Sequence, residues 1–442
     1  MENQIFLEKN ISKAYFKLAI PLVFSMVVTL IYNLADTYFV AQTSNTYLVA
    51  GVSLGAPIFT ILMAIGNIFG QGGSSLMSRL LGSKEIEGAK SVSAFCFYAS
   101  LAIGFIISVI MLGFQNLFIQ LLGGTSQTYK YLSSYYRCLS IGAPMIILSF
   151  IHSNLLRSEG KSKESMLGTI IGAILNVILD PIFIFEFDLG ASGAAIATVL
   201  GYMISNLYYL YVVRKNNTNI SISIKDLKIP FLYIQSIIAI GVPAAIVNVM
   251  QGLSVIIMNQ FLINYGNDKV AAMGIAVKVG MIALLLLTGL VFGGQPLFGY
   301  YYGSNDKNRL KKLLHFSFRF ISAIALFLTI IIYVSAPYLM EIFMDNVTIL
   351  KEGIVMLRWQ IISMVFVGII LLITILFQSS GKAIGSFLLS VCRQGVIFIV
   401  VLLSGNYFFG YSGIIASQAI ADTITLFVAL LLFYHQLYKE LY

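Results

Sequence analysis

The sequence contains about twelve apolar blocks of roughly 20 to 28 residues each, separated by short polar connections. A helix of that length rises far enough, at about 1.5 Å per residue, to cross a hydrocarbon core of about 30 Å. Hydrophobic residues make up 59% of the chain and charged residues only 10%, a balance that no water-soluble core can accommodate. No barrel-like alternation is present, so we predict an all-α integral membrane protein.

We predict twelve transmembrane helices, bounded by where each apolar block begins and ends. They cover residues 14–40, 48–73, 91–114, 135–156, 167–187, 191–213, 236–262, 270–300, 313–334, 357–377, 385–409 and 413–434. Lys and Arg gather at the amino end and in every second connection, so the positive-inside rule places both termini in the cytoplasm. The net charge of +9 is therefore explained by Lys and Arg residues that set the orientation in the membrane. We expect no nucleic-acid partner.

The chain repeats itself at an offset of about 221 residues. The segment 158–161 recurs at 379–382 with its Gly-Lys pair in register, and Pro21 pairs with Pro243. An offset of six helices restores the direction of insertion, which makes the halves parallel repeats. We therefore predict two pseudo-symmetric six-helix lobes, 1–213 and 236–442, joined by a cytoplasmic linker at 214–235.

The sequence also indicates whether ATP could drive this protein. Gly160-Lys161-Ser162 looks like the end of a phosphate-binding loop, but Leu155 stands where that motif needs a glycine. We interpret both Gly-Lys segments as turns and expect neither ATP coupling nor a cofactor. The three cysteines are scattered and predict neither a disulfide framework nor a metal centre.

Acidic residues inside the apolar blocks are the most informative, because a buried carboxylate is costly unless it is paired or protonated. Asp36 lies in the first block and Asp180 in the fifth, both in the outer half of the bilayer. Asn176 precedes Asp180 by one helical turn, and Thr198 of the sixth block reaches a similar depth. These oxygens suit Na⁺, while two neighbouring acids can equally share a proton. The alternative is that each acid merely pairs with a neighbour.

The second half keeps the scaffold without these acids. At the repeat offset, Asp36 corresponds to about Met258, and Asp180 to Val400 or Val401. This asymmetry favours a functional role for the first-half acids.

Three further charges lie within apolar blocks, and the sequence leaves their roles open. We expect Arg393 to extend its side chain to the cytoplasm. Lys278 is a candidate for the substrate cavity, or for an ion pair with Asp422. Pro21 and Pro181 are candidate hinges.

Several motifs resemble the multidrug and toxic compound extrusion (MATE) family, in its DinF-like and MepA-like prokaryotic branch. They are Ile20-Pro21 and the segment 33–37 in the first helix, and the segment 176–181 in the fifth. The resemblance implies a cation site formed by Asp36, Asn176, Asp180 and Thr198, a bend at Pro21, and drug contacts at Tyr32 and Asn154. The NorM-like branch carries acids on the seventh and tenth helices. Here the tenth has none, and the seventh offers Asn248, Gln251 and Asn259 instead.

We therefore expect a secondary-active exporter of the prokaryotic plasma membrane, working by alternating access of two lobes in exchange for Na⁺ or H⁺. Its expected partners are small amphipathic drugs or toxins, including cationic ones, and a monomer is expected. A flippase for a lipid-linked saccharide is the alternative, but it needs a more cationic cavity than Lys278 supplies. A membrane-embedded enzyme would need a nucleophile, metal cluster or acid/base set near one surface, and the chain has no His-rich, Gly-x-Ser-x-Gly or H-E-x-x-H motif. A channel would need rings of charge.

Overall fold

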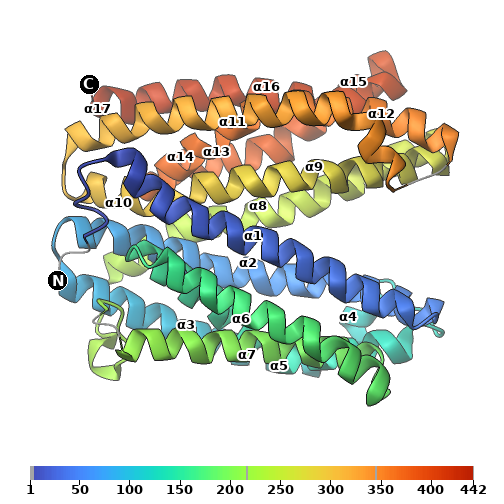
Figure 1. Cartoon of the computed structure of the whole chain (residues 1–442), viewed down its shortest axis with the longest axis horizontal. Coiled ribbons are helices and arrows are strands. Elements are labelled where there is room, and N and C mark those ends of the chain that lie inside the picture. Colours follow the sequence, from blue (N-terminus) through green and yellow to red (C-terminus); the bar gives the residue numbers. More distant parts are fainter. Residues whose placement is uncertain (1–3, 216–217, 344–345, 442) are drawn as a thin grey trace.

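The computed structural model describes residues 4–215, 218–343 and 346–441, and helices dominate this part of the chain (Figure 1). Within it, eleven helices are long and apolar enough to cross a membrane, and a bent pair of helices supplies a twelfth span. Large apolar side chains such as Val109, Val334 and Phe427 point outward on these helices, as they do where the solvent is lipid. The prediction of an all-α membrane fold is confirmed.

The helices of the first half are α1 (Ile11–Gln42), α2 (Thr46–Gly82), α3 (Ile86–Gly113), α4 (Gln115–Leu121), α5 (Tyr129–Ser158), α6 (Ser162–Pro181) with the π-helical turn η1 (Ile182–Glu186), and α7 (Ala191–Lys215). The linker contains the short helix η2 (Ile224–Leu227). The short α4 is absent from the predicted helices, because seven residues make too small an apolar block to stand out.

The helices of the second half are α8 (Phe231–Leu262), η3 (Ile263–Tyr265), α9 (Asn267–Gly293), α10 (Gln295–Gly303), α11 (Lys307–Glu341), α12 (Val347–Ile362), α13 (Met364–Ser379), α14 (Ala383–Val391), η4 (Cys392–Val396), α15 (Ile397–Phe409), α16 (Tyr411–Phe433), η5 (Tyr434–Tyr438) and α17 (Lys439–Leu441). The predicted tenth helix, 357–377, is broken at Ser363 between α12 and α13, which are bent by 40°. No proline or glycine marks this break in the sequence.

The helix ends have local causes. Asn10 caps α1 by accepting the N–H of Lys13 at 3.2 Å. After α5 and α13 the chain turns at Gly160 and Gly381, whose φ angles of 85° and 76° favour glycine. In each turn the lysine that follows donates its N–H back to a carbonyl five residues earlier, at 2.9 and 2.8 Å. Both Gly-Lys segments are therefore helix-ending turns, as predicted.

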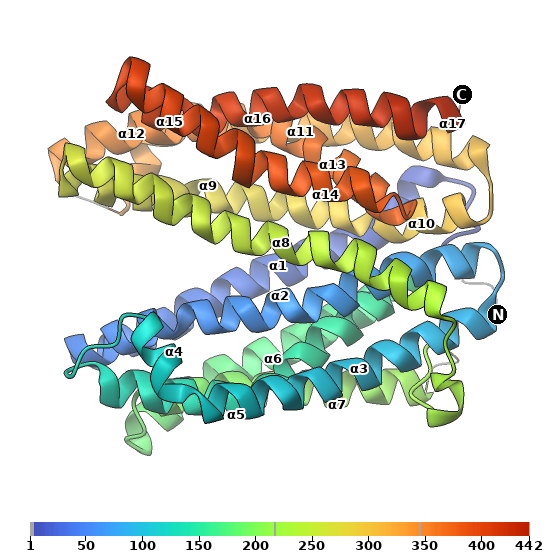
Figure 2. The same ribbon diagram turned by 180° about the vertical axis from the view of Figure 1, so that it is seen from behind.

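The two halves form two bundles side by side, α1–α7 in one and α8–α17 in the other (Figures 1 and 2). Each bundle has its own apolar core, represented by Ile147 in the first and Ile361 in the second. The start of α1, including Tyr15 and Ala19, instead packs with helices of the second half. The predicted lobe limits stay a prediction, and residues 1–3, 216–217, 344–345 and 442 of those segments lie outside the described residues.

The bundles touch through backbone at the end of the molecule where both chain ends lie (Figure 1). A Cβ on Gly72 would lie 2.1 Å from the Ile237 carbonyl oxygen, and one on Gly82 would lie 2.2 Å from that of Tyr300. From the other side, a Cβ on Gly303 would lie 2.1 Å from the Arg79 carbonyl oxygen. These positions accept only glycine at the present helix spacing.

Candidate functional site

Helices α6 and α7 approach closely because glycines face each other. A Cβ on Gly172 would lie 2.0 Å from Ser205 Oγ and 2.6 Å from the Gly201 carbonyl oxygen, and one on Gly201 would lie 2.7 Å from the Gly172 carbonyl oxygen. Ser205 also donates its hydroxyl to the Gly168 carbonyl at 2.9 Å. This contact sets the distance between polar side chains one turn farther along both helices.

Asn176 lies one turn beyond Gly172 and joins the two helices. Its Nδ2 lies 3.4 Å from Asp180 Oδ1 on α6 and 3.4 Å from Thr198 Oγ1 on α7. Asp180 and Asn176 are buried, and Thr198 is half-buried. The structure therefore brings these three predicted residues together.

Asp36 is supplied by α1, which packs directly against α6. It is half-buried, and it lies near enough to Asp180 for the two carboxylates to interact electrostatically. One turn earlier, the hydroxyl of Tyr32 lies 3.2 Å from that of Tyr202 on α7. All four predicted ligands thus belong to one neighbourhood.

Three buried oxygens of this cluster have no hydrogen-bond partner in the described part of the chain. They are Asp36 Oδ1, Asn176 Oδ1 and Asp180 Oδ2. A buried polar atom without a partner costs roughly 1–3 kcal/mol, and more if it is charged. Two carboxylates and a neutral amide oxygen are hard ligands, which fit a small cation or a shared proton. No cluster of three His, Cys, Asp or Glu side chains forms a metal site among the described residues.

Tyr202 was not among the predicted site residues. It follows Thr198 by four residues on α7, so helical spacing alone could have placed it on the same face. Its ring packs against those of Phe59 and Phe150, with centroids 5.8 and 5.9 Å away, and these two rings also contact each other. Tyr202 thus extends the polar cluster into an aromatic wall of the same lobe.

The remaining predicted residues of the first half lie elsewhere. Asn154 is buried on α5, where its Nδ2 donates to the Phe150 carbonyl at 2.6 Å and its Oδ1 accepts from Arg157. Pro21 lies inside the uninterrupted α1, whereas Pro181 ends α6 just before η1. Their predicted roles in drug contact and bending stay predictions.

The charges of the second half are arranged differently from what the sequence suggested. Arg393 does not extend to the cytoplasm, because its Nε donates to Asp422 Oδ1 at 3.0 Å. Lys278 is exposed on α9, and within the described residues the partners of Asp422 are Arg393, Ser363 and Gln418 instead. The expected pair of Lys278 with Asp422 is therefore wrong, since Arg393 of the adjacent turn η4 pairs with this carboxylate instead.

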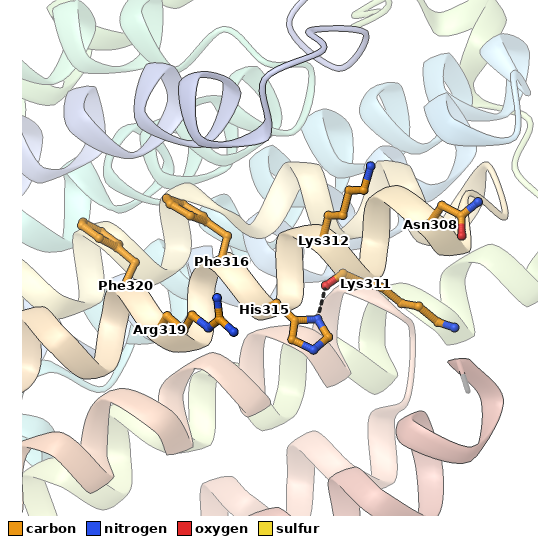
Figure 3. Close-up of a pocket in the computed structure, with 7 residues that line it drawn as sticks. All are labelled: Asn308, Lys311, Lys312, His315, Phe316, Arg319 and Phe320. Carbon is orange, nitrogen blue, oxygen red and sulfur yellow. Dashed lines mark hydrogen bonds between the residues drawn. The ribbon is translucent and has the colours of Figure 1, made fainter.

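A groove of about 1040 Å³ runs along α11 (Figure 3). All of its lining residues come from that one helix: Asn308, Lys311, Lys312, His315, Phe316, Arg319 and Phe320. Its two phenylalanine rings contact Phe16 of α1. Among the described residues, no second helix lines this groove, and its basic residues match the charge pattern that predicts orientation.

Two bundles of membrane-spanning helices, with an acidic cluster buried in one of them, define a polytopic membrane transporter. The MatE family model matches the chain twice, over residues 21–182 and 243–403, which together exceed half of its length. The chain belongs to the MatE family, as the sequence resemblance implied. The two matches begin at Pro21 and Pro243, the prolines paired in the repeat.

Two relatives show the same kinship over nearly the full chain. Multidrug export protein MepA of Staphylococcus aureus (strain MRSA252) is 31% identical, covering 98% of this chain and 96% of its own. MepA of Staphylococcus haemolyticus is 32% identical, covering 97% and 94%. A solved structure described as the outward-facing conformation of a multidrug resistance MATE family transporter superposes with a TM-score of 0.91 at 25% identity, covering 97% and 96%.

Proposed function

We propose that this chain exports small amphipathic compounds, including cationic ones, across a prokaryotic plasma membrane in exchange for Na⁺ or H⁺. The MepA relatives are named for multidrug export, and the fold matches that of a multidrug resistance transporter. Both termini face the cytoplasm in this proposal, because Lys and Arg are concentrated on that side. One chain is the working unit.

The observation that carries the proposal is the set of unpartnered oxygens on Asp36, Asn176 and Asp180. Two neighbouring carboxylates inside a membrane bundle repel each other and are poorly solvated. A Na⁺ or a proton relieves both costs, so its arrival changes which packing of the lobe has the lower free energy. An ion that binds one state better than another can shift the equilibrium between them.

The mechanism that we propose is antiport. From the outside, where Na⁺ or H⁺ is more concentrated, the cation binds at Asp36 and Asp180 and neutralises them. The first lobe then repacks, with Pro21 and Pro181 as the points where α1 and α6 adjust, and the exported compound is released. The glycine-mediated contact between the bundles closes the end assigned to the cytoplasm. Loss of the cation to the cell interior restores affinity for the next substrate.

The test is transport by purified protein in vesicles, with either a Na⁺ or a proton gradient imposed and a fluorescent cationic dye as substrate. Asp36→Asn and Asp180→Asn are each expected to abolish gradient-driven dye transport while the protein stays folded in the membrane. Asp188→Asn, at an exposed acid outside the cluster, is the matched control and is expected to transport normally. Normal transport by both cluster variants would contradict the proposal.

A further inference from the structure

The second lobe contains a cavity of about 150 Å³ with an ion pair in its wall. Arg393 and Asp422 line it together with the amide side chains of Gln251, Gln360 and Gln418. The lining residues come from α8, α9, α12, α13, η4, α15 and α16. Unlike the groove on α11, this cavity therefore receives polar groups from several helices at once.

Asp422 joins its own helix α16 to irregular points of two other spans. Its Oδ2 accepts the hydroxyl of Ser363 at 2.8 Å, where α12 and α13 meet in the broken span. Its Oδ1 accepts from Arg393 at 3.0 Å, within the π-helical turn η4, and from Gln418 of its own helix at 3.1 Å. Single π-helical turns inside helices are frequent at functional sites.

The first lobe shows that the fold does not need this ion pair. The register that pairs Gly160 with Gly381 places Arg393 opposite Gly172. The register that pairs Gly190 with Gly410 places Asp422 opposite Tyr202, one residue after Gly201. In the first lobe this level of the helix pair is closed by glycine contact. In the second lobe a buried charge pair stands there beside an open cavity, at the expense of desolvating two charges.

The guanidinium of Arg393 has unused capacity. In the described part of the chain it spends one of its five N–H donors, the Nε–H, on Asp422. Its planar fork matches the two oxygens of a carboxylate better than any other side chain does. Gln394 supplies a second donor. Its Oε1 accepts the hydroxyl of Ser254 at 2.8 Å, which leaves its NH₂ group to donate to a ligand.

The rest of the wall favours an aromatic group. Four methionines line the cavity, and their thioethers contact ring edges favourably. They are Met258, Met273, Met281 and Met364. A volume of about 150 Å³ is enough for a single benzene-sized ring, whereas a whole drug-sized ligand needs roughly 300–1,000 Å³. The cavity therefore accommodates one end of a larger molecule.

We propose that this second-lobe cavity binds the aromatic, carboxylate-bearing end of a transported compound, with Arg393 as its anchor. The Nη groups hold the ligand carboxylate while the Nε–H stays on Asp422. The proposal rests on the proposed export function for the statement that the ligand is transported. Binding itself needs no ion gradient and does not involve Asp36 or Asp180.

The test measures equilibrium binding of two matched probes, benzoate and its uncharged analogue benzamide, to the purified full chain by calorimetry. The unmodified chain is expected to bind the carboxylate about tenfold more tightly than the amide. Arg393→Gln is expected to bring this ratio close to one, and Arg393→Lys to leave an intermediate ratio because the charge stays but the fork is lost. Arg319→Gln, at an exposed arginine on α11, is the control and keeps the full ratio.

The double variant Arg393→Gln with Asp422→Asn keeps the test open if Arg393→Gln does not fold, since it leaves no unpaired charge. It is expected to lose the carboxylate preference as well. Equal or undetectable binding of both probes by the unmodified chain overturns the proposal, and so does a folded variant without Arg393 that still prefers the carboxylate. Because no gradient is applied, these outcomes are independent of whether Asp36→Asn abolishes coupled transport.

Discussion

In the first lobe, Asp36 and Asp180 lie near each other and no cationic side chain of the described residues pairs with either. In the second lobe, Asp422 is bonded by Arg393 and two neutral side chains. The two lobes share one scaffold but treat buried carboxylates differently. In the first lobe the carboxylates have no cationic partner among the described residues, and in the second lobe Arg393 neutralises Asp422. The difference teaches that fold symmetry places the helices, while the charged side chains inside each lobe are chosen independently. In the antiport proposed above, this choice makes the first lobe the one that responds to an external cation.

The largest expected effect concerns the balanced pair. Asp422→Ala is expected to lower the free energy of unfolding by about 3–5 kcal/mol, because Arg393 is left buried without its partner. The double variant Arg393→Met with Asp422→Leu is expected to recover most of that loss, because no charge remains. Thermal unfolding of the detergent-purified proteins measures both. A double variant as unstable as the single one would show that the loss does not come from the unpaired arginine.

The next effect tests the glycine contact that replaces this pair in the first lobe. Gly172→Ala is expected to cost about 1–3 kcal/mol, because its methyl group would meet Ser205 Oγ and the Gly201 carbonyl. Gly274→Ala on α9, where a Cβ meets no atom within 4 Å, is the control and is expected to stabilise by about 0.5–1 kcal/mol. Equal effects of the two substitutions on the melting temperature would argue against close packing of α6 and α7.

A smaller effect separates the two coupling ions. Thr198→Val keeps the side-chain shape but removes an oxygen from the acidic cluster. If Na⁺ is the coupling ion, the half-saturating Na⁺ concentration for dye transport is expected to rise about tenfold, equivalent to about 1.4 kcal/mol. Proton-driven transport is expected to change little, since a shared proton needs only the two acids. Transport titrated against each ion in vesicles gives the answer.

The smallest effect on the free energy of unfolding is expected at Asp180, which has no cationic partner among the described residues. Asp180→Asn is expected to cost no more than about 0.5 kcal/mol, because it removes a like-charge contact and keeps an oxygen for the Asn176 amide. The same thermal unfolding assay used for Asp422→Ala allows direct comparison. A loss as large as that of Asp422→Ala would mean that Asp180 is balanced by an internal partner, and the contrast between the lobes would fail.

Residue spacing along single helices predicted most of the membrane spans and the position of the first-lobe polar residues. Apolar block length predicted the spans to within a few residues at most ends. Depth along the helices correctly predicted that Asn176, Asp180 and Thr198 meet and that Asp36 of α1 comes near Asp180, whereas their role as cation ligands stays a prediction. These inferences succeeded because each uses spacing within a single helix, combined with a common membrane boundary.

What spacing could not predict depends on contacts between helices. The break at Ser363 has no proline or glycine signal, and the hydroxyl there bonds Asp422 of a distant helix. Arg393 looked able to reach the cytoplasm because the sequence gives its depth but not its direction. The rotation of each helix about its own axis decides which charges meet, and packing against neighbours sets that rotation.

The backbone contact between the bundles, made by Gly72, Gly82 and Gly303, bears on the alternating access proposed for the two lobes. Its atoms are already ordered by their helices, so parting them frees no rotamers and rejoining them freezes none. Dispersion attraction fades by a quarter to a half over a gap of roughly 0.5–1 Å. In the proposed alternating access, such a contact is expected to be either fully closed or fully open, with few intermediate arrangements.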